Sequence, residues 1–277
     1  MGCYLIVAVP AYIVRKELSV ALPKYASTIT QIIMGMNALS GVVVGLSLGG
    51  TYKIGLQNFL LIVAISTIWP FYQRLSYFSN IKVEAGVFYL IQNTQVLYSA
   101  FFAYFIVDER LNVIEMLAMV LLIASSIIAK STSVNQKQHF KYIAIAFLVP
   151  VMYGFGTTLE KLSIDTITYG SYILIGFSMQ FLFSLILKKP NLVEYKSLLN
   201  SKFKPKVAVY AVLYSAKGIL LTASFATGKA SLTNAVASFT GVLILIAAYF
   251  FLNEKEHMVK KLIATVIGVI GILIIRL

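Results

Sequence analysis

The sequence contains few of the residues that enzymes and metal sites depend on. Its 277 residues include one cysteine, Cys3, and two histidines, His139 and His257. A single cysteine excludes an intramolecular disulfide and a cysteine-based metal site. Neither histidine has the aspartate partner of a His-Asp pair, and no aspartate pair lies in an apolar segment. The sequence therefore disfavours a membrane-embedded acyl or glycosyl transferase, which would need such groups for acid-base catalysis, and we expect no enzyme and no cofactor.

Charge is also scarce. Charged residues make up 12% of the chain and hydrophobic residues 59%, with a mean hydropathy of +0.86, whereas soluble domains carry about 25% charged residues. Five uncharged runs reach 20 residues or more: 25–52, 54–73, 85–107, 166–187 and 230–253. Because about 20 apolar residues span the hydrocarbon core as a helix, we expect a multi-pass protein of the plasma (inner) membrane.

The apolar runs and the breaks between them predict an all-α fold with ten transmembrane helices. The expected helices are 2–21, 26–50, 54–78, 84–107, 112–130, 141–162, 166–187, 206–228, 230–252 and 257–276. The segment 188–205 is rich in lysine and bracketed by Pro190 and Pro205. It is expected to be a surface loop with room for one interfacial helix.

The second half of the chain repeats the first. With a shift of 145 positions, residues 83–130 align without gaps on 228–275, and Ala103-Tyr104-Phe105 falls on Ala248-Tyr249-Phe250. Internal repeats in so apolar a chain are typical of secondary transporters. Five helices per repeat force the second copy to enter from the opposite face. The sequence therefore predicts two inverted five-helix repeats, 1–130 and 141–277, joined by a linker at 131–140.

The net charge of +13 would suggest a nucleic-acid partner in a soluble protein. Here the basic residues lie in the loops, where they anchor helix ends and set orientation, so no nucleic acid is expected. One side of the expected topology holds five basic residues and the other seventeen, including most of the 188–206 cluster. The positive-inside rule then places the 188–205 loop in the cytoplasm and both termini outside.

A short motif closes the fourth helix of each repeat: Asp108-Glu109-Arg110 in the first and Asn253-Glu254-Lys255 in the second. With the apolar helix that follows it, this pattern resembles the EamA-type repeat of the drug/metabolite transporter superfamily. The resemblance implies ten helices in two inverted repeats, and export or exchange of small metabolites driven by a gradient, for example of a coupling proton or ion. It also implies cytoplasmic termini, opposite to the charge count, so orientation stays open.

The acidic residues of the chain have two interpretations. Glu109 and Glu254 match the repeated glutamate of the family and could be coupling carboxylates. Their place at a loop favours a structural role, in which they pair with Arg110 or Lys255 and lie near the start of the next helix. Glu17 and Glu160 are the nearest counterparts of the buried glutamate in small multidrug relatives. Both stand beside a lysine, and we expect them to be neutralised near the membrane boundary, which argues against transport of cationic drugs.

Small residues and prolines in the apolar segments favour packing roles. Gly41, Gly45 and Gly49 recur every four residues, the spacing that lets helices approach closely. Pro10 and Pro150 each remove a backbone donor inside an apolar helix, so a kink is expected at both.

Polar and aromatic side chains at membrane depth indicate a solute site. Tyr210, Tyr214, Lys217, Leu221 and Ser224 share one helix face, with Lys217 near the bilayer centre. The 145-residue shift places the last four on Trp69, Tyr72, Ser76 and Ser79. Amides at depth need partners inside the bundle, and the sequence holds Gln31, Asn37 and Gln180 besides the group Gln92, Asn93 and Gln95.

The sequence as a whole predicts a secondary transporter, exporter or exchanger, of a small polar metabolite that is neutral, zwitterionic or anionic. The cavity would lie between the repeats, with Lys217 as its electrostatic anchor, Trp69, Tyr72, Tyr210 and Tyr214 as aromatic walls, and hydrogen bonds from Gln92, Asn93 and Gln95. No acidic residue is expected at the depth of Lys217. The alternatives are an antiporter of nucleotide sugars or similar anionic solutes, and a membrane assembly subunit that transports nothing.

Overall fold

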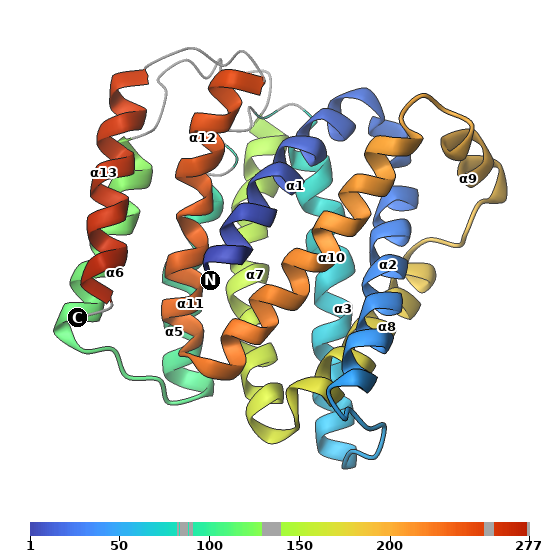
Figure 1. Ribbon diagram of the computed structural model, residues 1–277, viewed down its shortest axis with the longest axis horizontal. Helices are drawn as coiled ribbons and strands as arrows, with labels where there is room; N and C mark the ends of the chain where they lie inside the picture. Colours follow the sequence, from blue (N-terminus) through green and yellow to red (C-terminus); the bar gives the residue numbers. More distant parts are fainter. Residues whose placement is uncertain (82, 84–87, 89–90, 129–139, 252–257, 276–277) are drawn as a thin grey trace.

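The structure, a computed structural model of residues 1–277, describes all residues except 82, 84–87, 89–90, 129–139, 252–257 and 276–277. Within the described residues the chain is helical and contains no β-strand, which confirms the predicted all-α class. The long helices stand roughly side by side as a bundle, and the connections gather at its two ends (Figure 1).

Most of the described helices begin and end close to the predicted positions, whereas the predicted helices 84–107 and 230–252 are each interrupted. The first half contains α1 (Gly2–Ala21), the 3₁₀ turn η1 (Pro23–Tyr25), α2 (Ala26–Ser47), α3 (Leu56–Ser79), α5 (Gln95–Ile106) and α6 (Val113–Ile128). The second half contains α7 (Phe140–Thr166), α8 (Tyr169–Leu187), α9 (Leu192–Leu199), α10 (Lys204–Thr227), α11 (Ala230–Ser238), α12 (Thr240–Phe251) and α13 (Met258–Ile275). The prolines Pro10 and Pro150 lie inside the continuous helices α1 and α7.

Four of the described helical segments are long and apolar enough to cross a membrane: Pro23–Ser47, Leu56–Ser79, Tyr169–Leu187 and Lys204–Thr227. A helix needs about 20 predominantly apolar residues for this. These segments fit a membrane protein, and the full set of ten crossings remains a prediction.

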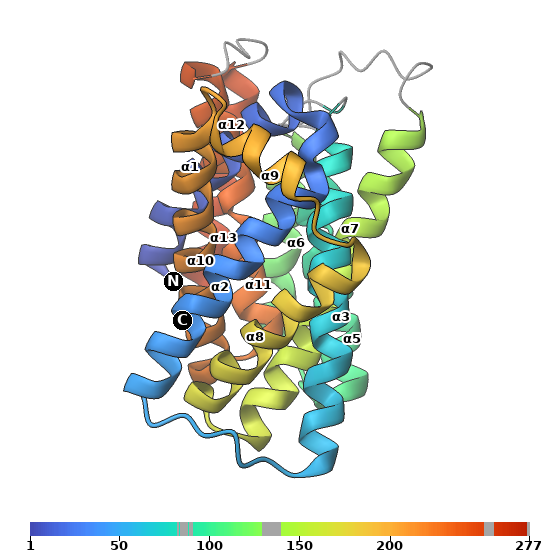
Figure 2. The same cartoon turned by 90° about the vertical axis from the view of Figure 1, so that its right-hand side faces the viewer.

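The contacts between helices follow the repeat: most contacts of a helix in one half are matched by contacts of the equivalent helix in the other half. Helix α2 packs on its counterpart α8, and α6 packs on its counterpart α13. The contact of α3 with α7 is matched by that of α10 with α1, and the contact of α5 with α7 is matched by that of α12 with α1. Figure 2 shows α2 between α10 and α8, at the side of the bundle that α9 covers at one end. Most of the packing is thus between the halves rather than within them.

The predicted helix 230–252 is interrupted, and this corrects the sequence-based prediction. Helix α11 ends at Ser238, and the Phe239 amide donates to the Val236 carbonyl three residues back. The same irregularity occurs 145 positions earlier, where the Thr94 amide donates to the Ile91 carbonyl just before α5. A bond to the third residue back tightens one turn and leaves carbonyls of the regular ladder without their usual partner. The break is therefore a shared feature of the two halves, and no proline or glycine at 94 or 239 announced it.

Two of the three glycines predicted to allow close packing lie where α2 crosses α8. A Cβ atom added at Gly41 would lie 2.6 Å from the Ile173 carbonyl oxygen, and one at Gly45 would lie 2.8 Å from the Gly170 carbonyl oxygen. The packing prediction is confirmed for this pair. Gly49 has a different role, because it ends α2 with φ of +72°, a conformation that glycine adopts without strain.

The loop 188–205 holds helix α9, as the sequence allowed. The Asn191 side chain caps the helix by accepting from the Val193 and Glu194 amides. Glu194 then ties the loop to the bundle: its carboxylate accepts from Lys188 Nζ at 2.7 and 2.8 Å and from the Thr28 hydroxyl at the start of α2. These bonds, the one from Lys188 first, hold the pKa of Glu194 below its usual value.

The first prediction is that Gly45→Ala destabilises the protein. Alanine should stabilise an isolated helix by about 1 kcal/mol over glycine, but overpacking at a close contact costs about 1–3 kcal/mol. We therefore expect a lower midpoint of thermal unfolding in detergent. Gly55→Ala, where an added Cβ would contact nothing within 4 Å, is the control. An unfolding midpoint for Gly45→Ala at or above that of the wild type would contradict the close contact of α2 with α8 at Gly45.

The second prediction concerns the pH dependence of the α9 anchor. The folded pKa of Glu194 is depressed, so its contribution to stability is present above the pKa of the unfolded chain and is lost as the pH falls through the lower, folded pKa. Protection of the α9 amides, that is, their exchange rate relative to the intrinsic rate at the same pH, should fall in this acidic range. In Glu194→Gln, protection should already be low at neutral pH and change little on acidification. Equal profiles for wild type and variant would refute the anchor.

Candidate functional site

A cavity of about 40 Å³ lies inside the bundle, at the level where helices of both halves meet. Its wall combines four aromatic side chains with one lysine and one glutamate: Trp69, Tyr72, Tyr153, Tyr214, Lys217 and Glu160. These side chains come from α3 of the first half and from α7 and α10 of the second half. The cavity therefore lies at the contact between halves, where the sequence predicted a solute site.

Lys217 is the central cation of this cavity. Only 5% of the residue is exposed, and its Nζ lies 4.6 Å from the Tyr12 ring centroid and 4.7 Å from the Tyr214 ring centroid. The ammonium also donates to the Tyr12 hydroxyl at 3.3 Å. Aromatic faces attract cations by about 2 kcal/mol when water is excluded, so the two rings offset part of the cost of burying this charge. The predicted aromatic surroundings are found, with Tyr12 in place of Tyr210.

A second buried cation shares one of these rings. Arg15 of α1 is fully buried, and its Cζ lies 4.8 Å from the Tyr12 ring centroid and 5.4 Å from that of Phe88. Neither Arg15 nor Tyr12 was predicted from the sequence to lie at this site. A signal was present, since residues three apart share a helix face, but the adjacent Lys16 and Glu17 made the segment look like a helix end.

Glu160 corrects the sequence-based prediction for the acidic residues. It was expected to be neutralised near the boundary by Lys161, and no acidic residue was expected at the depth of Lys217. Instead Lys161 pairs with Asp165 at 2.6 Å, and Glu160 points inward, 3% exposed. Its carboxylate accepts from the Thr222 hydroxyl at 2.6 Å. Glu160 directly precedes Lys161, and adjacent residues of a helix differ by a rotation of about 100°, so the two side chains lie on different faces.

Glu17 does lie near a helix end, as predicted, although its partner differs. Its carboxylate pairs with Lys206 Nζ of α10 at 2.5 Å. The adjacent Lys16 instead donates to the Asn80 and Val83 carbonyls beyond the end of α3, at 2.9 and 2.6 Å.

The aromatic walls are formed by a cluster that spans the halves. The Trp69 ring packs edge-on against Tyr72 at 5.4 Å and against Tyr153 of α7 at 5.5 Å. Tyr153 also lies over Tyr72 at 5.4 Å, much as Tyr12 lies over Lys217 in the symmetric contact of α1 with α10. Tyr210 lies one turn from Tyr214, with ring centroids 6.0 Å apart, and its hydroxyl accepts from Gln73. It is buried, but it does not line the cavity.

The three amides predicted as ligands lie elsewhere. Gln92 donates to Gln95 at 2.9 Å, and Asn93 lies against the position where a Cβ of Gly241 would be, 2.8 Å away. They are buried beside the helix breaks at 94 and 239 and do not line the cavity. The amides that do line it are Asn37 and Gln180. All five amides are buried, as their place in the apolar segments predicted, but helical spacing did not show which of them face the cavity.

Glu109 has a structural contact that crosses the halves. Its carboxylate accepts from the Ala230 amide at 2.6 Å, the Ser231 amide at 3.2 Å and the Ser231 hydroxyl at 2.8 Å, so it caps the N-terminus of α11. It does not pair with Arg110, which lies beside Asp108. The helix that follows Glu109 in the chain is α6, and Glu115 takes part in capping its N-terminus. The Glu115 carboxylate accepts from the Asn112 amide and pairs with Lys229. Glu254 lies outside the described residues.

The described residues contain no group of three or more His, Cys, Asp or Glu side chains that could hold a metal ion. The cavity presents one lysine and one glutamate side chain at an aromatic surface.

No protein-family model and no curated protein matches the sequence. A solved structure described as "Crystal structure of protein" superposes on the chain with a TM-score of 0.64 at 12% identity, over 98% of this chain and 97% of the other. A likeness at this identity shows that the two chains share a fold along their full lengths.

The third prediction tests the role of Glu109. Removing its charge should weaken the cap of α11 by about 1 kcal/mol, the usual worth of a capping side chain near the positive end of a helix. We expect Glu109→Gln to lower the thermal midpoint and the folded yield, and to leave the transport expected from the sequence nearly unchanged per folded molecule. Asp108→Asn, at a pair that is almost fully exposed, is the control. Loss of transport in normally folded Glu109→Gln would show that the residue couples transport instead.

Proposed function

We propose that this chain is a secondary active transporter of a small polar metabolite, an exporter or exchanger of the EamA type in the drug/metabolite transporter superfamily. It would cross the plasma (inner) membrane ten times, in two inverted repeats at 1–130 and 141–277. Three observations support this: the helix bounds, the contacts that are unchanged when the halves are exchanged, and the equivalent helix breaks at 94 and 239. Discontinuous helices beside a site between repeats are common in secondary transporters.

The observation that carries the proposal is the pair of opposite charges buried at one cavity. Lys217 and Glu160 both line it, yet they form no ion pair with each other. A lysine at the centre of a membrane helix costs about 2.5–3.5 kcal/mol on insertion scales, and pairing with its neighbour would reduce that cost. Two separate charges are instead suited to a zwitterion, whose carboxylate meets Lys217 and whose ammonium meets Glu160.

The size of the cavity indicates how such a solute would enter. About 40 Å³ is close to the roughly 30 Å³ share of one water molecule. No metabolite fits until helices of the two halves move apart, so this conformation is the occluded one. The aromatic cluster around Trp69 would pack on the apolar part of the solute once the cavity widens.

Ion pairs at the two ends of the bundle suggest how access would alternate. At one end Lys229 of the second half pairs with Glu115 of the first at 2.7 Å. At the other end Lys206 of the second half pairs with Glu17 of the first at 2.5 Å. Rocking one half against the other would break one pair and keep the second, so the cavity would open to one side at a time.

A second candidate is an antiporter of anionic solutes, and one observation favours it. Arg15 and Lys217 both lie against the Tyr12 ring, so the region next to the cavity holds two cations. The positive potential of such a region favours a solute with two negative charges. The role of Glu160 separates the candidates, because a dianion gains nothing from a carboxylate, whereas an ammonium group does.

The fourth prediction tests this site. In proteoliposomes, Lys217→Met should remain folded and lose at least tenfold in uptake, together with the thermal stabilisation that its solute gives the wild type. Lys189→Met, at an exposed lysine, is the control. Substrates would first be found by thermal shift with amino acids, betaines, organic dianions and nucleotide sugars.

Glu160→Gln then decides the solute class. It should weaken the response to zwitterions and spare, or strengthen, any response to anions. Full transport by Lys217→Met would refute the site. An unchanged zwitterion response in Glu160→Gln would refute the pairing and favour the anion antiporter. No transport of any solute by the wild type would favour a non-transporting assembly subunit.

A further inference from the structure

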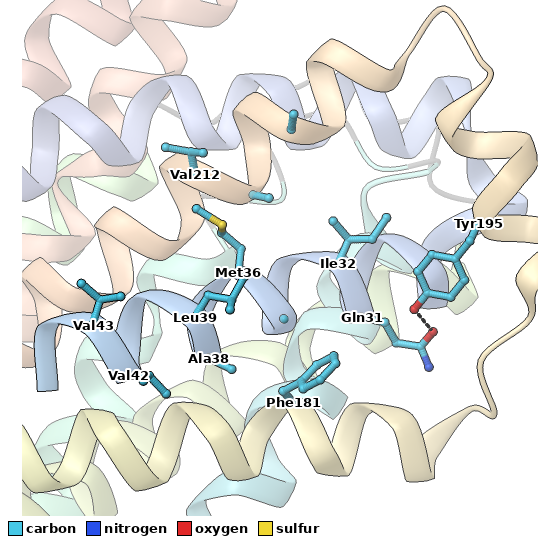
Figure 3. Close-up of a pocket in the computed structure, with 13 residues that line it drawn as sticks. Gln31, Ile32, Met36, Ala38, Leu39, Val42, Val43, Phe181, Tyr195 and Val212 are labelled. Atoms are coloured by element: carbon cyan, nitrogen blue, oxygen red, sulfur yellow. Dashed lines mark hydrogen bonds between the residues drawn. The ribbon is translucent and has the colours of Figure 1, made fainter. Parts of the chain in front are cut away.

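A second concavity lies on the outside of the bundle. Its lining is mostly apolar, whereas that of the central cavity includes a lysine and a glutamate. It is a groove of about 800 Å³ along α2, between α8 and α10, bordered at one end by Tyr195 of α9 (Figure 3). Among its lining side chains only Gln31 and Tyr195 are polar, and both lie at that end. The groove shares none of its residues with the central cavity.

The polar end of the groove is already satisfied by hydrogen bonds. The Tyr195 hydroxyl donates to the Gln31 Oε1 at 2.8 Å, and Gln31 Nε2 donates to the Ser184 and Lys188 carbonyls at the end of α8. The remaining wall is aliphatic or aromatic, and Leu39 and Val43 on its floor are 67% and 69% exposed. A polar solute would find no partner here, so the chemistry of the groove selects an apolar chain.

The length of the groove matches one leaflet of a bilayer. Its floor runs along α2 from Gln31 to Val43 (Figure 3), which at 1.5 Å per residue is about 18 Å. Half of the hydrocarbon core is about 15 Å. An occupant that enters at the α9 end would therefore reach about the midplane.

Helix α9 marks the polar boundary of that leaflet. Leu192 and Val193 on its outside are 74% and 75% exposed, and an amphipathic helix with exposed apolar residues lies at the membrane interface. The segment 188–206 around it contains six lysines and one glutamate. Lys188 pairs with Glu194, and Lys206 pairs with Glu17, whereas Lys196 and Lys204 form no ion pair with any described carboxylate.

One of these free lysines is in register with the groove. Lys204 precedes the lining residues Ala208 and Ala211 by four and seven positions on α10, and residues at this spacing share a helix face. It is exposed, and it stands where the open end of the groove meets the headgroup region. Basic clusters at the membrane surface attract anionic lipids.

We propose that this groove binds one acyl chain of an anionic phospholipid, whose phosphate is held by Lys204 with help from Lys196. The inference needs only that these helices span a membrane, so it does not depend on transport. The acyl chain and the headgroup of the lipid are recognised by different parts of the site, and each part can be changed by a separate substitution.

Native mass spectrometry of the full chain, released from nanodiscs with equal amounts of phosphatidylglycerol and phosphatidylcholine of the same chain length, tests the proposal. The wild type should retain one lipid, with phosphatidylglycerol preferred. Ala208→Trp places a large side chain in the groove at an exposed position, and it should lose the retained lipid. Val209→Trp, at the next residue and outside the groove, is the matched control and should keep it.

The headgroup is tested by Lys204→Gln, which should reduce the preference for phosphatidylglycerol roughly fivefold, the effect of one basic residue near a membrane surface. Lys53→Gln, at an exposed lysine of the α2–α3 loop, should leave it unchanged. Equal lipid retention by Ala208→Trp and Val209→Trp would overturn the proposal. So would a wild-type dimer without bound lipid that Ala208→Trp converts to monomers, since the occupant would then be a second copy of the chain.

Discussion

The burial of the Lys217 ammonium is the constraint on which the arrangement of the interior depends. A charge there must be offset by groups that reach it from neighbouring helices. Those groups are rings, one from α1 and one from its own helix. The Tyr12 ring that contacts Lys217 also contacts Arg15 of its own helix, so Tyr12 is the side chain through which the Lys217 ammonium joins α10 to α1.

The symmetry of the packing explains why the interior site can be asymmetric. The helix face of α10 that carries Lys217 and the matching face of α3 occupy equivalent places in the two halves. Tyr72 therefore lies in the first half where Lys217 lies in the second. Because the two helices have equivalent surroundings, a lysine in place of an aromatic residue in one half introduces a charge there and leaves the packing of the other half unchanged. Glu160 on α7 and Lys217 on α10 both belong to the second half, so the cavity takes both of its ionisable side chains from the same half.

Much of this fold could be read from the sequence, because in so apolar a chain the helix bounds follow from where charge and polar turns interrupt the hydrophobic runs. The burial of Lys217, Trp69 and Tyr72 followed from helical spacing for the same reason. What spacing could not supply is the rotation of one helix against another. It left Arg15 and Glu160 assigned to helix ends, because a neighbouring charge was taken as the partner, and it placed Gln92 and Gln95 at the wrong interior surface. The break at Phe239 is a backbone irregularity with no residue-type signal, so it was missed as well.

The two concavities divide the chemistry of the chain between its interior and its outer face. The cavity at Lys217 is small, charged and enclosed, while the groove on α2 is long, apolar and open, and α2 and α10 border both. A movement of α10 that widens the cavity must therefore also change the groove, because the two lie on opposite faces of the same helix. An acyl chain that fits the groove only in the occluded conformation would stabilise that conformation by its differential affinity. On this argument, the composition of the surrounding leaflet would bias the opening of a site that it never touches.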